Sequence, residues 1–96
     1  MKYYDWNAEK NEWLKQEREV CFEDVKAALE NGKLLDTVPH YNKRQYPTQK
    51  ILVVEMQGYA YLVPFVEDEE KIFFKTIIPN REAAKKYLKT NQKKRL

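Results

Sequence analysis

The sequence is poor in the residues on which metal, disulfide and phosphate-loop chemistry depend. Its 96 residues include one cysteine, Cys21, and one histidine, His40. No intramolecular disulfide or zinc cluster can be built from them. The two glycines, Gly32 and Gly58, do not open a helix, which excludes a phosphate-binding loop. Because Cys21 directly precedes Phe22, we interpret it as a buried or helix-capping thiol and not as a nucleophile.

Long apolar runs are also missing. No segment approaches the length of a transmembrane helix, and residues 1–5 lack the apolar run of a signal peptide. A single cysteine is typical of a reducing compartment. We therefore expect a soluble, cytoplasmic chain with no membrane partner.

The composition favours one folded domain. Hydrophobic residues make up 43% of the chain and aromatic residues 14%, enough for a modest core. We predict a single domain over residues 1–90 and a basic C-terminal tail over 91–96. The net charge is only +3, but residues 85–95 contain six lysines and arginines and no acid. Such a basic end can bind nucleic acid or an acidic partner. A solvated, frayed terminus has the same composition and is the alternative.

The stretch from residue 49 to 78 organises the fold. Valine, isoleucine, tyrosine and phenylalanine dominate three runs, separated by Gln57-Gly58 and by the acidic residues 67–70. This pattern predicts a meander of three consecutive antiparallel strands. The predicted pairs are Met56 with Tyr59 and Glu55 with Ala60 in the first hairpin, and Val66 with Lys71 and Leu62 with Lys75 in the second.

Alternation along these strands separates two faces. The predicted core face holds Lys50, Leu52, Val54, Met56, Tyr59, Tyr61, Val63, Phe65, Ile72, Phe74, Thr76 and Ile78. The other face holds Ile51, Val53, Glu55, Ala60, Leu62, Pro64, Val66, Lys71, Phe73, Lys75 and Ile77. Glu55 and Lys75 lie near its middle, where an unpaired buried charge would be costly, so we expect this face to be open to a ligand. The alternative is that the two charges form a cross-sheet ion pair.

Capping residues and apolar periodicity predict the remaining elements. We expect a helix over residues 8–18 capped by Asn7 and docked through Trp13 and Leu14, and a second helix over 22–30 that ends at Asn31-Gly32. Residues 33–38 form a first strand or an extended connector. A last helix runs from Arg81, after the cap Asn80, to about residue 90. The class is therefore α+β: two N-terminal helices, an antiparallel meander of three to four strands, and a C-terminal helix.

Residues 39–49 are predicted to form a surface loop. They contain His40, Lys43, Arg44 and Tyr46 between two prolines. Loops with this density of imidazole, amine, guanidinium and phenol groups often carry ligand contacts. The sequence agrees equally well with an ordinary solvated connector that makes no ligand contacts.

The side chains that could carry chemistry form a general acid/base and electrostatic set. They are His40, Lys43, Arg44, Tyr46, Glu55, Lys75 and Arg81. Cleavage of RNA without a metal needs a group that accepts the 2′-hydroxyl proton, cations that stabilise the phosphate, and an acid for the leaving oxygen. These residue types can fill those roles. For His40 the alternative is a packing role in the loop.

Four segments resemble the BrnT family, the toxins of bacterial type II toxin–antitoxin systems. They are Tyr4-Asp5-Trp6-Asn7-Ala8-Glu9-Lys10-Asn11, Phe22-Glu23-Asp24-Val25, the hairpin meander, and the passage from Lys75 to Ala83. The resemblance implies a RelE-like fold with helices on one sheet face and RNA on the other, and ribonuclease activity against messenger RNA. It also implies a ribbon-helix-helix antitoxin that binds the toxin and represses the operon, so operator DNA is met only through the antitoxin.

We therefore expect an endoribonuclease toxin that needs no cofactor or metal. Its predicted catalytic residues are Glu55, Lys75, Arg81, His40 and Tyr46, and its predicted RNA-binding residues are Lys10, Asn11, Lys43, Arg44 and Lys85. Of these, Lys10, Asn11 and Arg81 are carried over by match to the family motif. The alternative is a non-catalytic module that binds a protein through the apolar residues Ile51, Val53, Leu62 and Phe73 of the open face.

Overall fold

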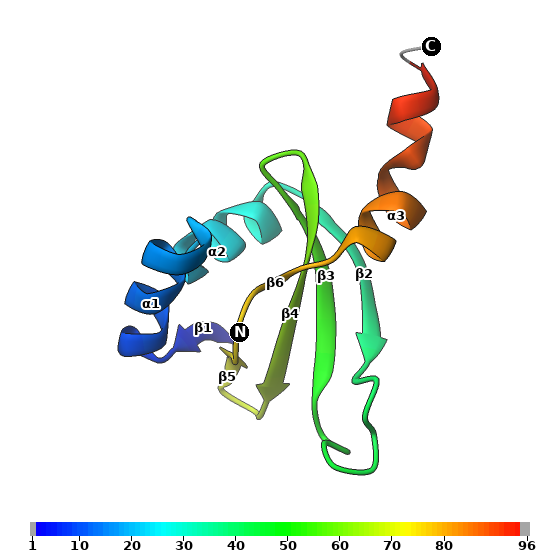
Figure 1. The fold of residues 1–96 in the computed structure, drawn as a ribbon. Coiled ribbons are helices and arrows are strands. Elements are labelled where there is room, and N and C mark those ends of the chain that lie inside the picture. Colours follow the sequence, from blue (N-terminus) through cyan, green and yellow to red (C-terminus); the bar gives the residue numbers. More distant parts are fainter. Residues whose placement is uncertain (1, 95–96) are drawn as a thin grey trace.

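Helices and strands account for most of the chain. The computed structural model describes the backbone of residues 2–94 and the side chains of residues 2–88. In chain order the elements are β1 (Tyr3–Trp6), α1 (Ala8–Arg18), α2 (Phe22–Glu30), β2 (Leu34–Pro39), β3 (Lys50–Met56), β4 (Tyr59–Glu67), β5 (Lys71–Phe74), β6 (Ile78–Pro79) and α3 (Arg81–Lys94), as Figure 1 shows. The α+β class is confirmed.

The strands form one mixed sheet. Its order is β1-β5-β4-β3-β2, and β6 pairs with the first part of β4. β1 runs parallel to β5, with Tyr3 opposite Lys71 and Trp6 opposite Phe74. The prediction of a purely antiparallel meander was therefore wrong. The segment before α1 is too short to signal a strand by itself, and it joins the sheet only because β5 leaves an edge for it.

The first hairpin has the predicted register. Met56 pairs with Tyr59 and Glu55 with Ala60. Gln57 and Gly58 both have positive φ, 57° and 74°, as a two-residue hairpin turn that matches the strand twist requires. Here the turn residues alone determined the pairing.

The second hairpin is shifted by two residues from the predicted register. Val66 pairs with Phe73, not with Lys71. The Asp68 carboxylate accepts hydrogen bonds from the backbone N–H groups of Glu70 and Lys71, and the Asp68 N–H donates to the Lys71 carbonyl. Asp68 therefore takes the position opposite Lys71 that the prediction had given to Val66. Because the shift is even, each side chain stays on its predicted face.

An irregularity between β5 and β6 reverses the faces. The Lys75 N–H donates to the Pro64 carbonyl, but Ile78 pairs with Leu62, so the third strand gains one residue between these points. Ile77 is consequently fully buried in the main core, although alternation predicted it on the opposite face. The Ile77 carbonyl accepts a hydrogen bond of 2.6 Å from Nη1 of Arg18 in α1, which satisfies a backbone group outside the regular ladder.

The main core lies between one face of the sheet and the helices α1 and α2. The predicted core-face residues of β3 and β4 pack there against Leu14, Phe22 and Val25, except for Lys50, which is exposed. Phe22 stacks on Phe74, with ring centroids 6.0 Å apart, and Trp6 stacks on both rings. Trp13 was predicted to dock α1 but is 42% exposed, with the cations of Lys10 and Arg18 over its ring. Leu14 alone of the predicted pair is buried.

The helix α3 packs on the other face of the sheet. Ala83, Ala84 and Leu88 form a second cluster with Val53 and Ala60, to which Leu35, Leu62 and Tyr87 add partly buried surface. The Tyr87 hydroxyl donates a hydrogen bond to Asp36 of β2. In Figure 1, α1 and α2 lie on one side of the sheet and α3 on the other, near the β3–β4 hairpin. The expectation that all helices cover one face was therefore wrong, since this face is covered at one end.

The helix boundaries follow their capping residues. The Asn7 carboxamide oxygen accepts from the Lys10 N–H, and that of Asn80 accepts from the Ala83 N–H, as the sequence predicted. Glycine at residue 32 has φ of 73°, in the left-handed region that ends helices. The α3 helix continues to Lys94, beyond its predicted end near residue 90. The predicted tail therefore begins inside α3, and its last two residues lie outside the described residues.

Candidate functional site

Within residues 2–94, no helix lies over the end of the second sheet face that is farther from the β3–β4 hairpin (Figure 1). The strand register places Val38, Ile51, Pro64 and Lys75 in one row across this region. The next row contains Gln49, Val66 and Phe73. Lys75 is exposed and Val38, Val66 and Phe73 are half-buried, whereas Ile51 and Pro64 at the middle of the first row are buried. We call this surface the uncovered half-face.

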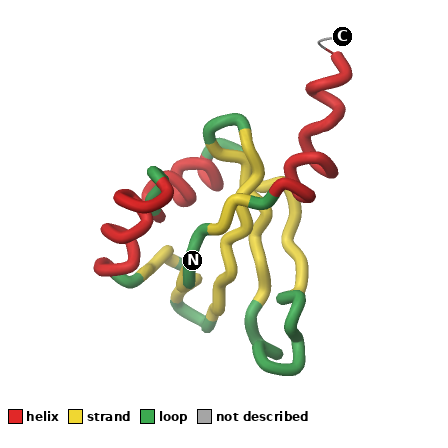
Figure 2. Tube along the Cα trace, in the orientation of Figure 1, coloured by secondary structure: helices red, strands yellow, loops and turns green. Residues whose placement is uncertain are grey.

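The loop between β2 and β3 borders the uncovered half-face. Figure 2 shows it extending beyond the end of the strands. His40 begins the loop, and its N–H donates to the Gln49 carbonyl, which closes the loop at its base. The His40 ring is 5% exposed and lies between two tyrosines, 4.4 Å from the Tyr41 ring and 4.7 Å from the Tyr46 ring. The sequence predicted a surface loop, and the structure adds an aromatic cluster within it.

A hydrogen bond fixes the proton position on His40. The imidazole Nδ1 accepts from the Asn42 N–H at 3.0 Å. In the neutral ring the proton therefore sits on Nε2, which becomes a donor. No buried side-chain nitrogen or oxygen in the described residues lacks a partner, and Nε2 has no protein partner there, so Nε2 reaches solvent. In this tautomer His40 is suited to donate a hydrogen bond through Nε2 and not to accept a proton there.

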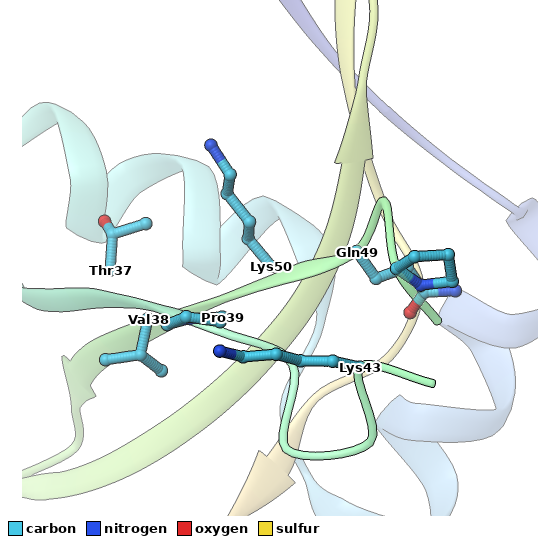
Figure 3. Close-up of a pocket in the computed structure, with 7 residues that line it drawn as sticks. Thr37, Val38, Pro39, Lys43, Gln49 and Lys50 are labelled. Atoms are coloured by element: carbon cyan, nitrogen blue, oxygen red, sulfur yellow. The ribbon is translucent and has the colours of Figure 1, made fainter. Parts of the chain in front are cut away.

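The loop and its flanks are basic. Residues 37–54 include Lys43, Arg44 and Lys50 and contain no aspartate or glutamate. A cavity of about 480 Å³ lies at the base of the loop, lined by Thr37, Val38, Pro39, Lys43, Pro47, Gln49 and Lys50 (Figure 3). Two lysines and no acid line it. The cavity can accommodate an anion such as a phosphate group.

Cations flank an aromatic ring at the far side of the uncovered half-face. The amines of Lys71 and Lys75 lie 5.7 and 5.5 Å from the Phe73 ring centroid. Lys71 is paired with Asp5 at 3.4 Å, and no such pair is found for Lys75 in the described part of the chain. Three strand spacings, about 14 Å, separate this edge from β2. Lys75 and the loop cations are therefore far enough apart to contact different phosphates of one nucleic-acid strand.

Glu55 lies away from this surface. It pairs with Ala60, whereas Lys75 lies opposite Pro64, and these two positions of β4 are about 13 Å apart. The described residues contain no ion pair between Glu55 and Lys75. Along β3, Glu55 is about 20 Å from Gln49 at the base of the loop. Glu55 and His40 therefore cannot act on the same phosphate.

Arg81 and Lys85 form a separate group at the β3–β4 hairpin end. With Tyr59 and Ala84 they line a shallow cavity at the start of α3. Tyr59 pairs with Met56, and Asn80 donates its N–H to Ala60, so this group lies at the opposite end of β4 from Lys75. The predicted catalytic set is thus divided between two ends of the sheet.

The α1 residues carried over from the family motif lie on the opposite side of the sheet from the loop and the uncovered half-face. Lys10 lies over the Trp13 ring on α1, on the other side of the sheet. Asn11 is 4% exposed: its carboxamide oxygen accepts from the Phe22 N–H at 2.7 Å, and its Nδ2 donates to Glu23 at 2.8 Å. The Asn11 contact lowers the pKa of Glu23. The contacts of Asn11 join α1 to the start of α2, and its predicted RNA contact has no support here.

Cys21 lies at the start of α2, as predicted, but its side chain is half-buried. It is the N-cap residue of α2, and its N–H donates to the Asp24 carboxylate at 3.2 Å. Burial raises the pKa of its thiol to about 11, which keeps the thiol protonated at neutral pH. Among the described residues, no three histidine, cysteine or acidic side chains gather as metal ligands. None of the helices described there is both long and apolar enough to cross a membrane.

Two further residues of the candidate site escaped the sequence analysis. Tyr41 is 80% exposed and stacked on His40, and Lys50 lines the cavity. The absence of acids between residues 37 and 54 was the available signal for Lys50. Tyr41 had no such signal, because alternation in a loop does not predict which ring is buried.

Comparisons with known proteins leave the family open. A scan against protein-family models, a search of curated proteins and a search of solved structures each returned no match. The functional argument therefore depends on the residues themselves and on the resemblance described above.

Proposed function

We propose that this chain is the toxin of a bacterial type II toxin–antitoxin pair and an endoribonuclease that cleaves messenger RNA. The observation that carries the proposal is the acid-free, aromatic loop of residues 40–49 beside the uncovered half-face. A surface with cations, stacked rings and an imidazole donor matches what an RNA strand presents: phosphates, bases and a leaving oxygen. The motif resemblance points to the same activity, to the RelE-like fold, and to a ribbon-helix-helix antitoxin as the partner.

The proposed mechanism uses residues from the loop end of the sheet. Lys43, Arg44 and Lys75 stabilise the charge that grows on the phosphate during attack by the 2′-hydroxyl. The Nε2–H group of His40 donates a hydrogen bond to the leaving 5′-oxygen, with Tyr46 beside it, and water supplies the proton that this oxygen takes up. The 2′-hydroxyl proton passes to water, because the loop has no carboxylate and Glu55 is at the other end of β3. This assigns His40 as a hydrogen-bond donor to the leaving group, not as the base.

Two matched double variants test the assignment. Lys43→Ala/Arg44→Ala removes two cations from the loop, and Arg81→Ala/Lys85→Ala removes two from the exposed start of α3. Each chain is expressed under tight induction in bacteria, and growth and total RNA integrity are followed. We expect the wild type and the α3 variant to arrest growth with RNA breakdown, and the loop variant to lose at least about tenfold in cleavage rate.

Other outcomes have definite consequences. Loss of toxicity in the α3 variant alone would move the active site to the Arg81 cavity. Full toxicity in both variants would overturn the proposed electrostatic mechanism. Normal growth and intact RNA on induction of the wild type would overturn the nuclease proposal itself.

The second candidate function is a protein-binding module on the same sheet face. The apolar surface open to a partner is smaller than the sequence indicated, because Ile51 and Val53 are only 3% and 2% exposed and Leu62 packs against α3. Ile51 and Phe73 both lie on the uncovered half-face, but of the two only Phe73, next to Val66, is accessible to a partner. An interface of this kind would keep its affinity as salt is added, whereas phosphate contacts weaken steeply.

A further inference from the structure

Tyr41 has a position that packing does not explain. Its side chain is 80% exposed, more than any other large hydrophobic residue among those described. One face of its ring is stacked on His40, with centroids 4.4 Å apart and ring planes 28° from parallel. The ring is therefore held in place from below while its outer face meets water.

The support beneath Tyr41 is rigid. His40 is buried, its N–H is bonded to Gln49, its Nδ1 accepts from Asn42, and its ring also contacts Tyr46. The Tyr46 N–H donates to the Asn42 carbonyl, which closes the loop on itself. A ring held in this way loses little conformational entropy when a flat ligand stacks on it.

The charges around Tyr41 indicate an anionic ligand. Lys43 and Arg44 follow within the same loop, both are exposed, and no acid lies between residues 37 and 54. An exposed aromatic ring beside cations is the arrangement that binds single-stranded nucleic acid, where bases stack on rings and phosphates meet cations. In duplex RNA both faces of each base are already stacked, and recognition relies on the groove shape and the backbone.

We propose that Tyr41 is a base-stacking residue, and that the substrate is single-stranded RNA with an unpaired base on the outer face of the Tyr41 ring. Lys43 and Arg44 bind the phosphates on either side of that base. This inference rests on the proposed ribonuclease function and specifies the substrate of the same site. It also predicts that cleavage falls in loops and unpaired segments of messenger RNA.

Binding to an RNA that cannot be cleaved tests the stacking role. The probe is a short, unstructured, fluorescein-labelled oligonucleotide with 2′-O-methyl groups, and the readout is fluorescence anisotropy. Five chains are compared: wild type, Tyr41→Ala, Tyr41→Phe, Tyr3→Ala and Lys43→Ala. Tyr3 is a matched control because it is 56% exposed on β1, at the opposite edge of the sheet from β2.

We expect Tyr41→Ala to bind about tenfold more weakly, and Tyr41→Phe to bind within about twofold of the wild type, because the ring and not the hydroxyl stacks. Tyr3→Ala should bind like the wild type. The slope of the logarithm of affinity against the logarithm of salt concentration should be unchanged in Tyr41→Ala. In Lys43→Ala, which loses one phosphate contact, the magnitude of this slope should fall by about 0.7. A hairpin duplex of the same composition should compete poorly.

The failures of this inference and of the proposed function can be told apart. If the wild type binds and cleaves RNA and Tyr41→Ala does the same, the stacking role is wrong and the nuclease function stands. A Tyr41→Phe variant as weak as Tyr41→Ala would overturn stacking in favour of a hydroxyl contact. Equal binding of the hairpin duplex would overturn the requirement for a single strand. Absence of both binding and cleavage in the wild type would overturn both proposals.

Discussion

At the scale of single residues, the polar groups that matter most to the fold are those with fixed partners. Asn11 is the clearest case. It was predicted to bind RNA, yet it is buried and bonded to the Phe22 N–H and to Glu23. The first N–H groups of a helix lack partners within the helix, so a side chain from elsewhere can satisfy one. Asn11 does this for α2.

Replacement of Asn11 by alanine should therefore destabilise the protein. The Phe22 N–H would be left without its partner in a buried position, a cost of about 1–3 kcal/mol in the free energy of unfolding. Asn31→Ala, at an exposed asparagine after α2, should cost less than about 0.5 kcal/mol. Urea titration measures both. Equal midpoints for the two variants would contradict the capping role of Asn11.

The same variant should change a titration. The Asn11 hydrogen bond lowers the pKa of Glu23. The stability that this bond contributes is therefore present above the pKa of Glu23 in the unfolded chain, and it is lost as pH falls through the lower pKa of the folded state. In Asn11→Ala the Glu23 pKa should rise toward its ordinary value, as carboxyl chemical shifts would report. The difference in stability between the variant and the wild type should shrink in acid.

At the scale of elements, turns and irregularities decided the positions that the apolar pattern left open. The Gln57-Gly58 turn set the β3–β4 register, whereas the Asp68 turn shifted the β4–β5 register by two residues. The extra residue after Lys75 then reversed the faces of Ile77 and Ile78. A one-residue change moves every later side chain to the other face, so regular alternation cannot predict it.

Two neighbouring substitutions test this reversal. Ile77 is 0% exposed in the main core, so Ile77→Ala should cost about 2–5 kcal/mol through lost burial and a cavity. Ile78 is only half-buried, and Ile78→Ala should cost clearly less. Regular alternation makes the opposite prediction. Denaturant unfolding of the two variants distinguishes the two registers, and a larger loss for Ile78→Ala would sink the one described here.

At the scale of the whole molecule, α3 determines how much of the second sheet face can bind a ligand. It covers Val53 and Ala60 near the β3–β4 hairpin and leaves the end with Lys75 and Phe73 uncovered. This separation places Arg81 and Glu55 at one end and His40 and Tyr46 at the other. Only the loop end combines cations, stacked rings and an imidazole hydrogen-bond donor.

The attachment of α3 should depend on pH through Tyr87. Its hydrogen bond to Asp36 raises the pKa of the Tyr87 phenol and lowers the pKa of the Asp36 carboxyl. The stability that the protonated Tyr87 phenol contributes is fully present below its unfolded-state pKa near 10. It is lost as pH rises through the higher pKa of the folded state. Tyr87→Phe should therefore be less stable than the wild type at neutral pH, and this difference should disappear in alkali.

Thermal unfolding from pH 7 to 11 measures this effect. Tyr41→Phe is the matched control, because its hydroxyl is on an 80% exposed ring with no such partner among the described residues. Its melting temperature should follow the wild type at every pH. A Tyr87→Phe curve that also follows the wild type would show that the Asp36 contact does not hold α3.

The sequence by itself determined the features that depend on neighbours along the chain. The caps at Asn7 and Asn80, the turn at Gln57-Gly58 and the alternation within each strand are local, so the α+β class, the helix starts and the main core face could be predicted. Only the tertiary structure decided the parallel pairing of β1, the side on which α3 packs, and the division of the predicted catalytic residues between two ends of the sheet. Each of these depends on contacts between segments far apart in the sequence, and no local preference encodes such distances.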